Sequence, residues 1–228
     1  MKLPIIPIFM VLSSFAFAQA IPIGTPNNGS LEGAECLPQE GEGYMQLYRN
    51  MQRIWGTMPM IDMIQKSAAD VARKYPGRDR LQVEDISAQS GGDIDGHGSH
   101  ENGQDVDLGF YKADGVEHDP RAKNQYYADP MVVNGKVSPN FDVERNWELM
   151  KALHRHGNVQ KIFVDQVLKR ELCRHARSKG EFSMNIQVLR SLRHETNHQD
   201  HMHVRLRCPP RAKNCSNLGE PPAGSGCP

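Results

Sequence analysis

The sequence contains 228 residues, with 27 Lys and Arg balanced by 27 Asp and Glu, and a formal net charge of +0 at pH 7. This balance argues against nucleic acid or another strongly charged surface as the partner. Beyond residue 20 no apolar stretch reaches the roughly 20 residues that a membrane span needs, and we predict one domain with a single core.

The chain begins with one Lys, an apolar run from Leu3 to about Phe17, and the small-residue patterns Ala16-Phe17-Ala18 and Ala18-Gln19-Ala20. The apolar run is too short, and its downstream flank too poor in charge, for a spanning helix. The layout is typical of a secretory signal peptide, so we assign residues 1–20 to a leader and expect an exported protein.

Residues 21–42 are rich in Gly, Pro and Asn and are predicted to form an irregular arm. Apolar and aromatic residues then recur at helical spacing from Tyr44 to Trp55, which predicts a helix that Gly56 ends. A second helix is expected from Pro59 to Pro76, because its apolar residues form a stripe on one face.

Two segments, Leu81 to Ser87 and Asp105 to Phe110, alternate apolar and polar residues and are predicted to be strands. Between them, Ser90 to Gln104 is a long loop dense in Gly and polar residues. Residues 112–140 show no sustained period. We interpret them as an excursion that borders the functional site, since long loops in compact domains tend to be functional.

The second half of the chain mixes helices and strands. Asp142 is the predicted cap of a helix that continues through Arg155, and Asp165 caps another that ends near Arg177. Strands are expected from Lys161 to Val164 and from His201 to Leu206. Because helices and strands do not alternate regularly, we predict an α+β fold.

Five cysteines are present: Cys36, Cys173, Cys208, Cys215 and Cys227. In an exported chain they are expected to form disulfides, and their odd number leaves at least one thiol unpaired. Cys208 and Cys215 bracket a short loop that suits a local bridge. No close pair of cysteines has the spacing of a zinc ribbon.

The stretch HQDHMHV, which begins at His198, places three histidines close together. In a strand His201 and His203 would point to one face, whereas Met202 and Val204 would point to the other. The first histidine of the stretch lies just before the strand, and a turn could fold it back toward the same place. Two or three imidazoles would then face one site.

A second histidine cluster lies in HGSHENGQDVDL, which contains His97, His100, Asp105 and Asp107. The two Asp residues would share a strand face, and the loop can bring His100 to the same place. With His203 this gives three protein ligands and leaves a fourth position to water, as in catalytic zinc sites. Such a zinc ion lowers the pKa of its water to about 7, so we predict a hydrolase of amides or esters.

The remaining histidines of the stretch HQDHMHV suggest acid–base chemistry. His201 is the candidate general base, because an unperturbed His titrates near 6.5, and His198 would stabilise a developing oxyanion or orient the base. Taken singly, a strand histidine pair or a pair of strand carboxylates is a common solvated surface feature, and only the combination indicates a site. Ser99 lies in no G-x-S-x-G elbow and is not expected to be a nucleophile. The other histidines are predicted to lie at the surface: His154, His156, His175 and His194.

The pattern H-x-x-x-x-x-x-D, followed much later by H-x-H, resembles the signature of the LAS metallopeptidases. Within that group, GHGSHENGQDVDL and HQDHMHVRLRCP are similar to the penicillin-insensitive murein endopeptidases, and weaker similarity extends over most of the chain. The resemblance implies one domain over residues 43–207, with a central, mainly antiparallel sheet flanked by helices and long loops. It also implies a periplasmic zinc enzyme that cuts the D-alanyl to meso-diaminopimelyl cross-link of peptidoglycan.

The resemblance also implies the role of each residue. His100, Asp107 and His203 match the zinc ligands of the family, which selects Asp107 where spacing alone left Asp105 open. His201 and His198 match the two histidines taken to be catalytic.

His97 matches a histidine that can join an additional metal in the family. The other residues of that second site are an Asp and a His, and this chain has Asn134 and Val137 in their place. We therefore expect one zinc ion rather than two. Relatives also tend to have a basic residue after the paired glycines, where this chain has Asp93, so substrate contacts there are expected to differ.

The resemblance further implies two disulfides, Cys208 with Cys215 and Cys173 with Cys227, which would pin a C-terminal tail over residues 208–228. Cys36 would be the odd thiol.

Two alternatives to the endopeptidase remain open. A D,D-carboxypeptidase or dipeptidase of the same metal group would cut a terminal residue, and a carboxylate-binding Arg near the site would favour it. A zinc-stabilised module that binds peptidoglycan without cutting it would have a closed metal site, and would give no reason for His198 and His201. The sequence does not determine the oligomeric state.

Overall fold

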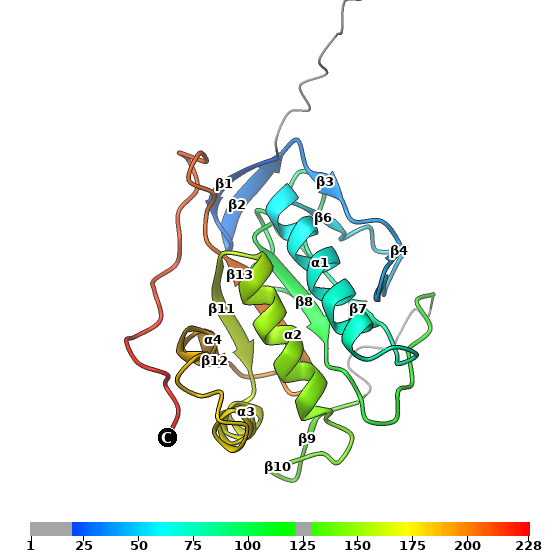
Figure 1. Ribbon diagram of the computed structural model, residues 1–228. Helices are drawn as coiled ribbons and strands as arrows, with labels where there is room; N and C mark the ends of the chain where they lie inside the picture. Colours follow the sequence, from blue (N-terminus) through cyan, green and yellow to red (C-terminus); the bar gives the residue numbers. More distant parts are fainter. Residues whose placement is uncertain (1–19, 122–128) are drawn as a thin grey trace, which may run out of the picture.

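The computed structural model describes residues 20–121 and 129–228, so the predicted leader lies, except for its last residue, outside the described residues. The core is a seven-stranded sheet in the order β12-β11-β13-β8-β7-β5-β4 (Figure 1). Neighbouring strands run antiparallel except in the β11–β12 and β5–β7 pairs, which confirms the predicted α+β fold with a mainly antiparallel sheet. These strands are β4 (Glu40–Gly41), β5 (Tyr44–Gln46), β7 (Leu81–Val83), β8 (Asp105–Gly109), β11 (Val159–Val164), β12 (Leu192–His194) and β13 (His201–Leu206).

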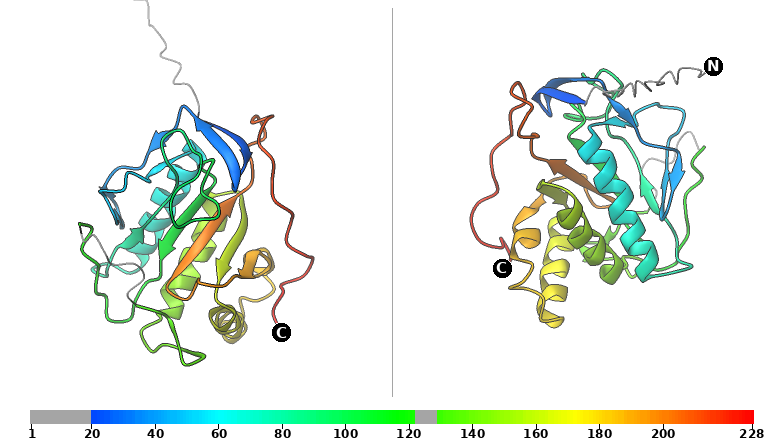
Figure 2. Two further views of the ribbon diagram at one scale, coloured as in Figure 1. Left: turned by 180° about the vertical axis from the view of Figure 1, so that it is seen from behind. Right: turned by 45° about the horizontal axis from the view of Figure 1, so that its top comes forward.

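Helices cover one face of this sheet and leave the other to loops. In Figure 1 the helices α1 (Met58–Lys74) and α2 (Val143–His156) lie in front of the central strands, with α3 (Gln166–Ser178) and α4 (Ile186–Ser191) toward the β11–β12 edge. Figure 2 shows the opposite face, over which the loop between β7 and β8 folds. The functional face is therefore the one without helices.

Apolar and polar side chains alternate along β8 and β13, and this alternation gives the sheet one apolar and one polar face. Val106 and Leu108 on β8 are fully buried in the hydrophobic core, as are Met202 and Val204 on β13. Because successive side chains of a strand point to opposite faces, the residues between them point away from the helices. The chemistry-bearing residues of both strands thus share one face, as predicted.

The predicted helices of the second half are confirmed, with their caps. The Asp142 carboxylate accepts a hydrogen bond from the Arg145 backbone N–H at the start of α2, and Asp165 accepts one from Val167 N–H at the start of α3. Such caps satisfy donors that the first helical turn leaves unpaired. The helix α1 also agrees, with Pro59 in its first turn.

Two predictions for the N-terminal third are wrong. Residues 21–42 are not irregular, because β1 (Ile21–Thr25) and β2 (Asn28–Glu32) form a hairpin, and β3 (Glu35–Cys36) pairs with β6 (Trp55–Gly56). The segment from Tyr44 to Trp55 is not a helix. Its first residues form β5, in which all three side chains are buried and which pairs with β7, so tertiary pairing overrides the helical spacing.

Two histidines expected at the surface are covered by protein. His175 on α3 is only 6% exposed. His154 on α2 is half-buried, and its Nε2 lies 2.8 Å from the Ser191 hydroxyl. Both residues occur in amphipathic helices, where the helical period alone left their burial undecided.

In residues 112–121 and 129–140 the excursion has no long elements, as expected, but none of these residues lines the cleft described below, which the excursion was expected to border; residues 122–128 lie outside the described part of the chain. The excursion contains a short hairpin of β9 (Val132–Val133) and β10 (Lys136–Val137). The Met131 backbone N–H donates to the carbonyl of Gln199, at 2.6 Å, directly before the histidine strand. The excursion therefore supports the turn that leads into β13.

The C-terminal tail is tied down by the two predicted disulfides, Cys173–Cys227 and Cys208–Cys215, and Cys36 is the free thiol. The short disulfide loop also joins the N-terminal hairpin, because the Gly24 N–H donates to Asn214 and its carbonyl accepts from Ser216 N–H, both at 2.8 Å. No helix in the described part of the chain is both long and apolar enough to cross a membrane.

Candidate active site

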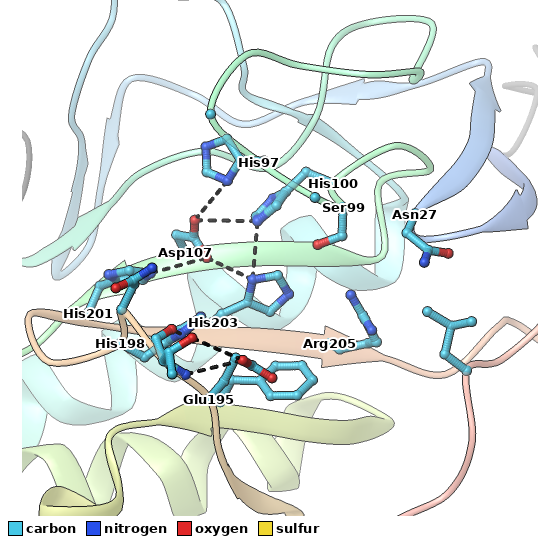
Figure 3. Close-up of a pocket in the computed structure, with 16 residues that line it drawn as sticks. Asn27, His97, Ser99, His100, Asp107, Glu195, His198, His201, His203 and Arg205 are labelled. Carbon is cyan, nitrogen blue, oxygen red and sulfur yellow. Dashed lines mark hydrogen bonds and ion pairs between the residues drawn. The ribbon is translucent and has the colours of Figure 1, made fainter.

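A cleft of about 460 Å³ opens on the face of the sheet without helices (Figure 3). All six residues predicted to act in the site line it: His97, His100, Asp107, His198, His201 and His203. Of the other residues singled out in the sequence, Ser99 lines the cleft as well. Asp93 and Asn134 are exposed or partly exposed residues that do not line it, so the Asp93 position is not a wall of this cleft.

Two strands carry the centre of the site. In the β8–β13 ladder Asp107 lies directly opposite His203, and Asp105 lies opposite Arg205. The Arg205 guanidinium donates two hydrogen bonds of 2.7 Å to the Asp105 carboxylate. Direct cross-strand pairs of this kind fix the register of the two strands, so the position of Asp107 beside His203 follows from the pairing.

The loop before β8 supplies the other side of the site. His100 has a positive φ of 73°, which is uncommon for a residue other than glycine. Its Nδ1 lies 2.9 Å from the Ile86 carbonyl, and its backbone N–H donates to Asp105 at 3.3 Å. These contacts hold the fully buried imidazole against the strand.

The three predicted metal ligands meet at one point. His100 Nε2 lies 3.2 Å from His203 Nδ1 and 3.3 Å from Asp107 Oδ2, and His203 Nδ1 lies 3.1 Å from Asp107 Oδ1 (Figure 3). His97 Nδ1 approaches the same carboxylate, at 3.6 Å from Oδ2. Three imidazole rings and one carboxylate thus converge.

The ring nitrogens that point away from this centre face protein acceptors. His100 Nδ1 faces the Ile86 carbonyl, His97 Nε2 faces Asp85 at 2.9 Å, and His203 Nε2 faces Asp105 at 3.3 Å. A carbonyl or an ionised carboxylate can only accept, so His100 Nδ1 and His97 Nε2 each carry the N–H of their ring, whereas the buried His203 Nε2 lies near Asp105 without a hydrogen bond. In the neutral form of His97 and His100 the other ring nitrogen is an acceptor that faces Asp107, and a cation between the nitrogen and the carboxylate would satisfy both.

This donor set fits a metal ion. The donor atoms of His97, His100 and Asp107 all lie within 4.8 Å of one another. His203 Nδ1 lies 3.2 Å from His100 Nε2 and 3.1 Å from Asp107 Oδ1, the carboxylate oxygen other than the one that His100 approaches. Atoms bound to a tetrahedral zinc ion at about 2.0–2.1 Å are roughly 3.3 Å apart. Metal-binding histidines usually donate their second N–H to a carboxylate or carbonyl, as His97 and His100 do. Asp107 Oδ1 is buried and has no hydrogen-bond partner in the described part of the chain.

The electrostatics favour a cation at the same point. Burial alone would lower the pKa of His203, but Asp105 and Asp107 outweigh it and raise the pKa to about 9. Burial would raise the pKa of Asp107, but His100, His201 and His203 hold it well below its usual value. His100 Nε2 and His203 Nδ1 lie only 3.2 Å apart, so either a proton or a metal ion must lie between these two nitrogens.

The remaining two histidines lie beside this centre. His201 directs Nε2 toward Asp107, at 3.9 Å from Oδ1, and its Nδ1 lies 2.7 Å from Asp200. The His198 ring lies 4.9 Å from that of His201, and its Nδ1 donates to the Thr196 carbonyl at 2.7 Å. Burial and the neighbouring His201 lower the pKa of His198, which favours its neutral form.

Several residues of the site were missed in the sequence. Asp200 stands inside HQDHMHV, next to His201, so its position was a usable signal. Asp85 precedes His97 by a long loop, and no pattern connects the two. Asn27 and Leu218 come from the N-terminal hairpin and the C-terminal tail and close one end of the cleft. Only the folded chain shows that these two ends meet.

Comparison with known proteins shows the family of the chain. The family model of the penicillin-insensitive murein endopeptidases matches residues 22–228. The chain belongs to this family. It is 34% identical over 215 residues to the penicillin-insensitive murein endopeptidase of Haemophilus influenzae, which covers 92% of this chain and 71% of the relative. Its identity to the proteins of the same name from Klebsiella pneumoniae and Escherichia coli strain SE11 is 31% and 30% over 207 residues, or 90% of this chain and 73% of each relative.

The family match includes both histidine segments and every element that builds the cleft, from the β1–β2 hairpin to the disulfide-bonded tail. The hairpin and the tail are therefore parts of the family domain rather than appendages to it. The residues that line the cleft can be compared with the family as one unit.

Proposed function

We propose that this member of the penicillin-insensitive murein endopeptidase family is a zinc-dependent endopeptidase that hydrolyses the D-alanyl to meso-diaminopimelyl cross-link of peptidoglycan. The observation that carries the proposal is the convergence of His100, Asp107 and His203, with each outward ring nitrogen facing a protein acceptor. The family to which the chain belongs supports peptidoglycan as the substrate.

In this proposal His100, Asp107 and His203 hold one zinc ion, and His97 lies beside it, at the place where the resemblance puts a ligand of an additional metal. When bound, the ion would polarise the scissile carbonyl and make water nucleophilic near neutral pH. The Asp105 carboxylate, which Arg205 fixes, keeps the His203 ring oriented toward the centre.

His201 is the proposed general base. Its Nε2 faces the cleft beside Asp107, where it can take the proton of the attacking water and return it to the leaving amine. Neutral His198 presents Nε2 as an acceptor, because its Nδ1–H is already donated to Thr196. This geometry favours proton acceptance by His198 over the donor role expected from the sequence, which would require the protonated ring.

A D,D-carboxypeptidase is the second candidate, and the discriminating feature is an Arg that could bind a terminal carboxylate. Arg205 lines the cleft, but its Nε and Nη2 are both engaged by Asp105. The endopeptidase is therefore the better-supported proposal. A binding module that does not cut remains an outcome of the test below.

We further propose that the protein acts in the periplasm, since residues 1–20 have the layout of a secretory leader. Two disulfides are consistent with an oxidising compartment. Fractionation of cells that produce the full chain should recover the shortened protein in the periplasmic fraction, and recovery of the uncleaved chain in the cytoplasm would contradict this.

The direct test is to measure the zinc content of the disulfide-intact protein and to digest purified cross-linked muropeptide dimers with and without a chelator. About one zinc ion per chain and chelator-sensitive conversion of dimers to monomers, detected by mass spectrometry, would support the proposal. Release of a terminal D-alanine without loss of dimers would support the carboxypeptidase. Bound zinc without cleavage of either kind would support the binding module.

The His201→Ala variant tests whether His201 acts as the general base or as a metal ligand. The variant should keep its zinc and lose roughly 10²- to 10⁴-fold in rate, the usual contribution of a general base. Loss of the metal from this variant would show that the roles of His201 and His203 are wrongly assigned.

A further inference from the structure

Two His–Asp pairs flank the Asp107 carboxylate, one on each side. His97 Nε2 lies 2.9 Å from Asp85, and its Nδ1 lies 3.6 Å from Asp107 Oδ2. His201 Nδ1 lies 2.7 Å from Asp200, and its Nε2 lies 3.9 Å from Asp107 Oδ1. Each pair directs one ring nitrogen toward a different oxygen of the same carboxylate (Figure 3).

The two pairs differ in what else the carboxylate contacts. Asp85 also accepts a hydrogen bond of 3.0 Å from the Arg53 guanidinium, so its negative charge is shared between two partners. Asp200 has no Lys or Arg nitrogen within 4.0 Å in the described part of the chain, and its one ion-pair partner there is His201. The charge of Asp200 is thus directed at a single imidazole.

The hydrogen bond also determines which ring nitrogen carries the proton. An ionised carboxylate only accepts, so the His201 Nδ1 must donate to it. The neutral ring then has its unprotonated nitrogen at Nε2, on the side of the cleft. A base needs this arrangement of its two ring nitrogens to accept a proton from water.

We propose that Asp200 is the positioning residue of His201: it fixes the tautomer and the orientation in which His201 accepts the proton. This inference rests on the proposed function, since it names the group behind the proposed base. The His97 ring is different. Its carboxylate is shared with Arg53, and its Nδ1 lies near the proposed metal ligand Asp107, which suits a ring that supports the metal site.

A role in the fold alone explains little of this arrangement. The Asp200 side chain makes one hydrogen bond in the described part of the chain, to His201, and it caps no helix and bridges no strands. It directly precedes β13 and lines a small cavity of about 20 Å³ together with Glu84 and Gln82. Removal of its charge should therefore change the catalytic histidine more than the stability.

The test compares Asp200→Asn and Asp200→Ala with Asp85→Asn and with the control Asp62→Asn, whose residue lies on an exposed face of α1. In the zinc-loaded protein the kcat of both Asp200 variants should fall by roughly 10²- to 10⁴-fold. KM and bound zinc should stay within about twofold. Asp85→Asn should instead weaken zinc binding, by about 10- to 100-fold for a partner of a metal-bound histidine, and Asp62→Asn should change neither.

A second measurement does not depend on activity. In ¹⁵N-histidine spectra of the zinc-loaded protein, with the His201 signals identified by their absence in His201→Gln, the wild type should show the Nδ1–H tautomer. Asp200→Ala should shift His201 to the Nε2–H form or to a mixture. Circular dichroism and urea unfolding of each variant confirm that the fold is kept.

The two measurements separate the inference from the proposed function. An Nε2–H tautomer in the wild type, or a tautomer unchanged in Asp200→Ala, would overturn the positioning role even in an active enzyme. A kcat that changes by less than about threefold in both folded Asp200 variants would overturn it as well. If the wild type cuts no muropeptide but its tautomer depends on Asp200, the proposed function fails while the positioning role is supported.

Discussion

The strand-borne half of the site and its loop-borne half are positioned by different interactions. Asp107 and His203 face each other because β8 and β13 pair in one register, which the neighbouring Asp105–Arg205 pair fixes. His97 and His100 lie on a loop, and side-chain contacts to Asp85 and to the Ile86 carbonyl hold them in place.

The difference shows which half of the site is more sensitive to substitution. Strand pairing positions Asp107 and His203 through many backbone hydrogen bonds, so single substitutions elsewhere leave it intact. The loop depends on a few contacts and on unusual backbone conformations, including the positive φ of His100. Errors in the loop should therefore affect the site before they affect the sheet.

The largest expected effect comes from removing one ligand from each half. His100→Ala and His203→Ala should both reduce bound zinc from about one ion per chain to background, and activity with it, because three ligands share one centre. His97→Ala should weaken binding without abolishing it. Metal analysis after dialysis, together with the muropeptide assay, measures both quantities.

The same three variants can also show that the loop-borne half of the site, rather than the strand-borne half, holds the metal. If His97→Ala loses its zinc completely while His203→Ala retains it, the centre is the loop-borne group of His97 and His100 with Asp107. In that case the strand-borne histidine would belong to the acid–base machinery. Urea unfolding of the three variants checks that none has simply lost its fold.

The sequence was most informative where periodicity determines the position of a side chain. Alternation predicted that His201 and His203 share a face, and that Met202 and Val204 enter the core, and the structure confirms both. The helix caps Asp142 and Asp165 were found because capping is a local interaction between residues two or three apart.

The sequence was least informative where contacts join distant segments. The spacing from Tyr44 to Trp55 suited a helix, but pairing of β5 with β7 decided the outcome. Likewise, Asp85 and His97 meet only because the loop folds back. The hairpin and the tail that close one end of the cleft are joined by backbone hydrogen bonds, which carry no signature in the sequence.

The fragility of the loop can be tested at its paired glycines. Gly91 and Gly92 both have positive φ, at 67° and 80°. A Cβ at Gly91 would lie 2.1 Å from the Glu101 carbonyl oxygen and 2.7 Å from the Leu31 nitrogen, whereas a Cβ at Gly92 would meet nothing within 4 Å. Alanine at either position costs about 1–2 kcal/mol for its backbone conformation, and Gly91→Ala should cost about 1–3 kcal/mol more for the clash.

Urea unfolding of Gly91→Ala and Gly92→Ala measures this difference in the free energy of unfolding. The Gly92→Ala variant is the matched control, because it has the same backbone cost without the clash. Because Glu101 follows His100, the Gly91 variant should also bind zinc more weakly than the Gly92 variant. Equal stability and equal zinc affinity of the two would mean that the loop adapts freely, and that its contacts do not position the site.

His154 has no carboxylate neighbour in the described part of the chain, and its pKa shifts in the direction opposite to that of His203. Carboxylates raise the pKa of His203 to about 9, whereas burial and then Arg207 lower the pKa of His154 to about 4. The Ser191 hydroxyl donates to Val188, so the His154 ring donates its Nε2–H to the hydroxyl oxygen and stays neutral. Neighbouring charges and burial thus shift the same side chain in opposite directions.

The smallest predicted effect follows from this lowered pKa. The unfolded chain binds a proton at residue 154 below a pH of about 6.5, while the folded protein resists protonation until about pH 4. This histidine therefore costs stability as the pH falls through that window, by about 2 kcal/mol between about pH 7 and pH 5.

His154→Gln keeps an amide donor near Ser191. On acidification its free energy of unfolding should therefore fall by about 2 kcal/mol less than that of the wild type. Urea unfolding of both proteins at the two pH values measures the difference, which cancels the titration of the shared metal-site groups. Equal losses in the two proteins would mean that His154 is already accessible to protons in the folded state.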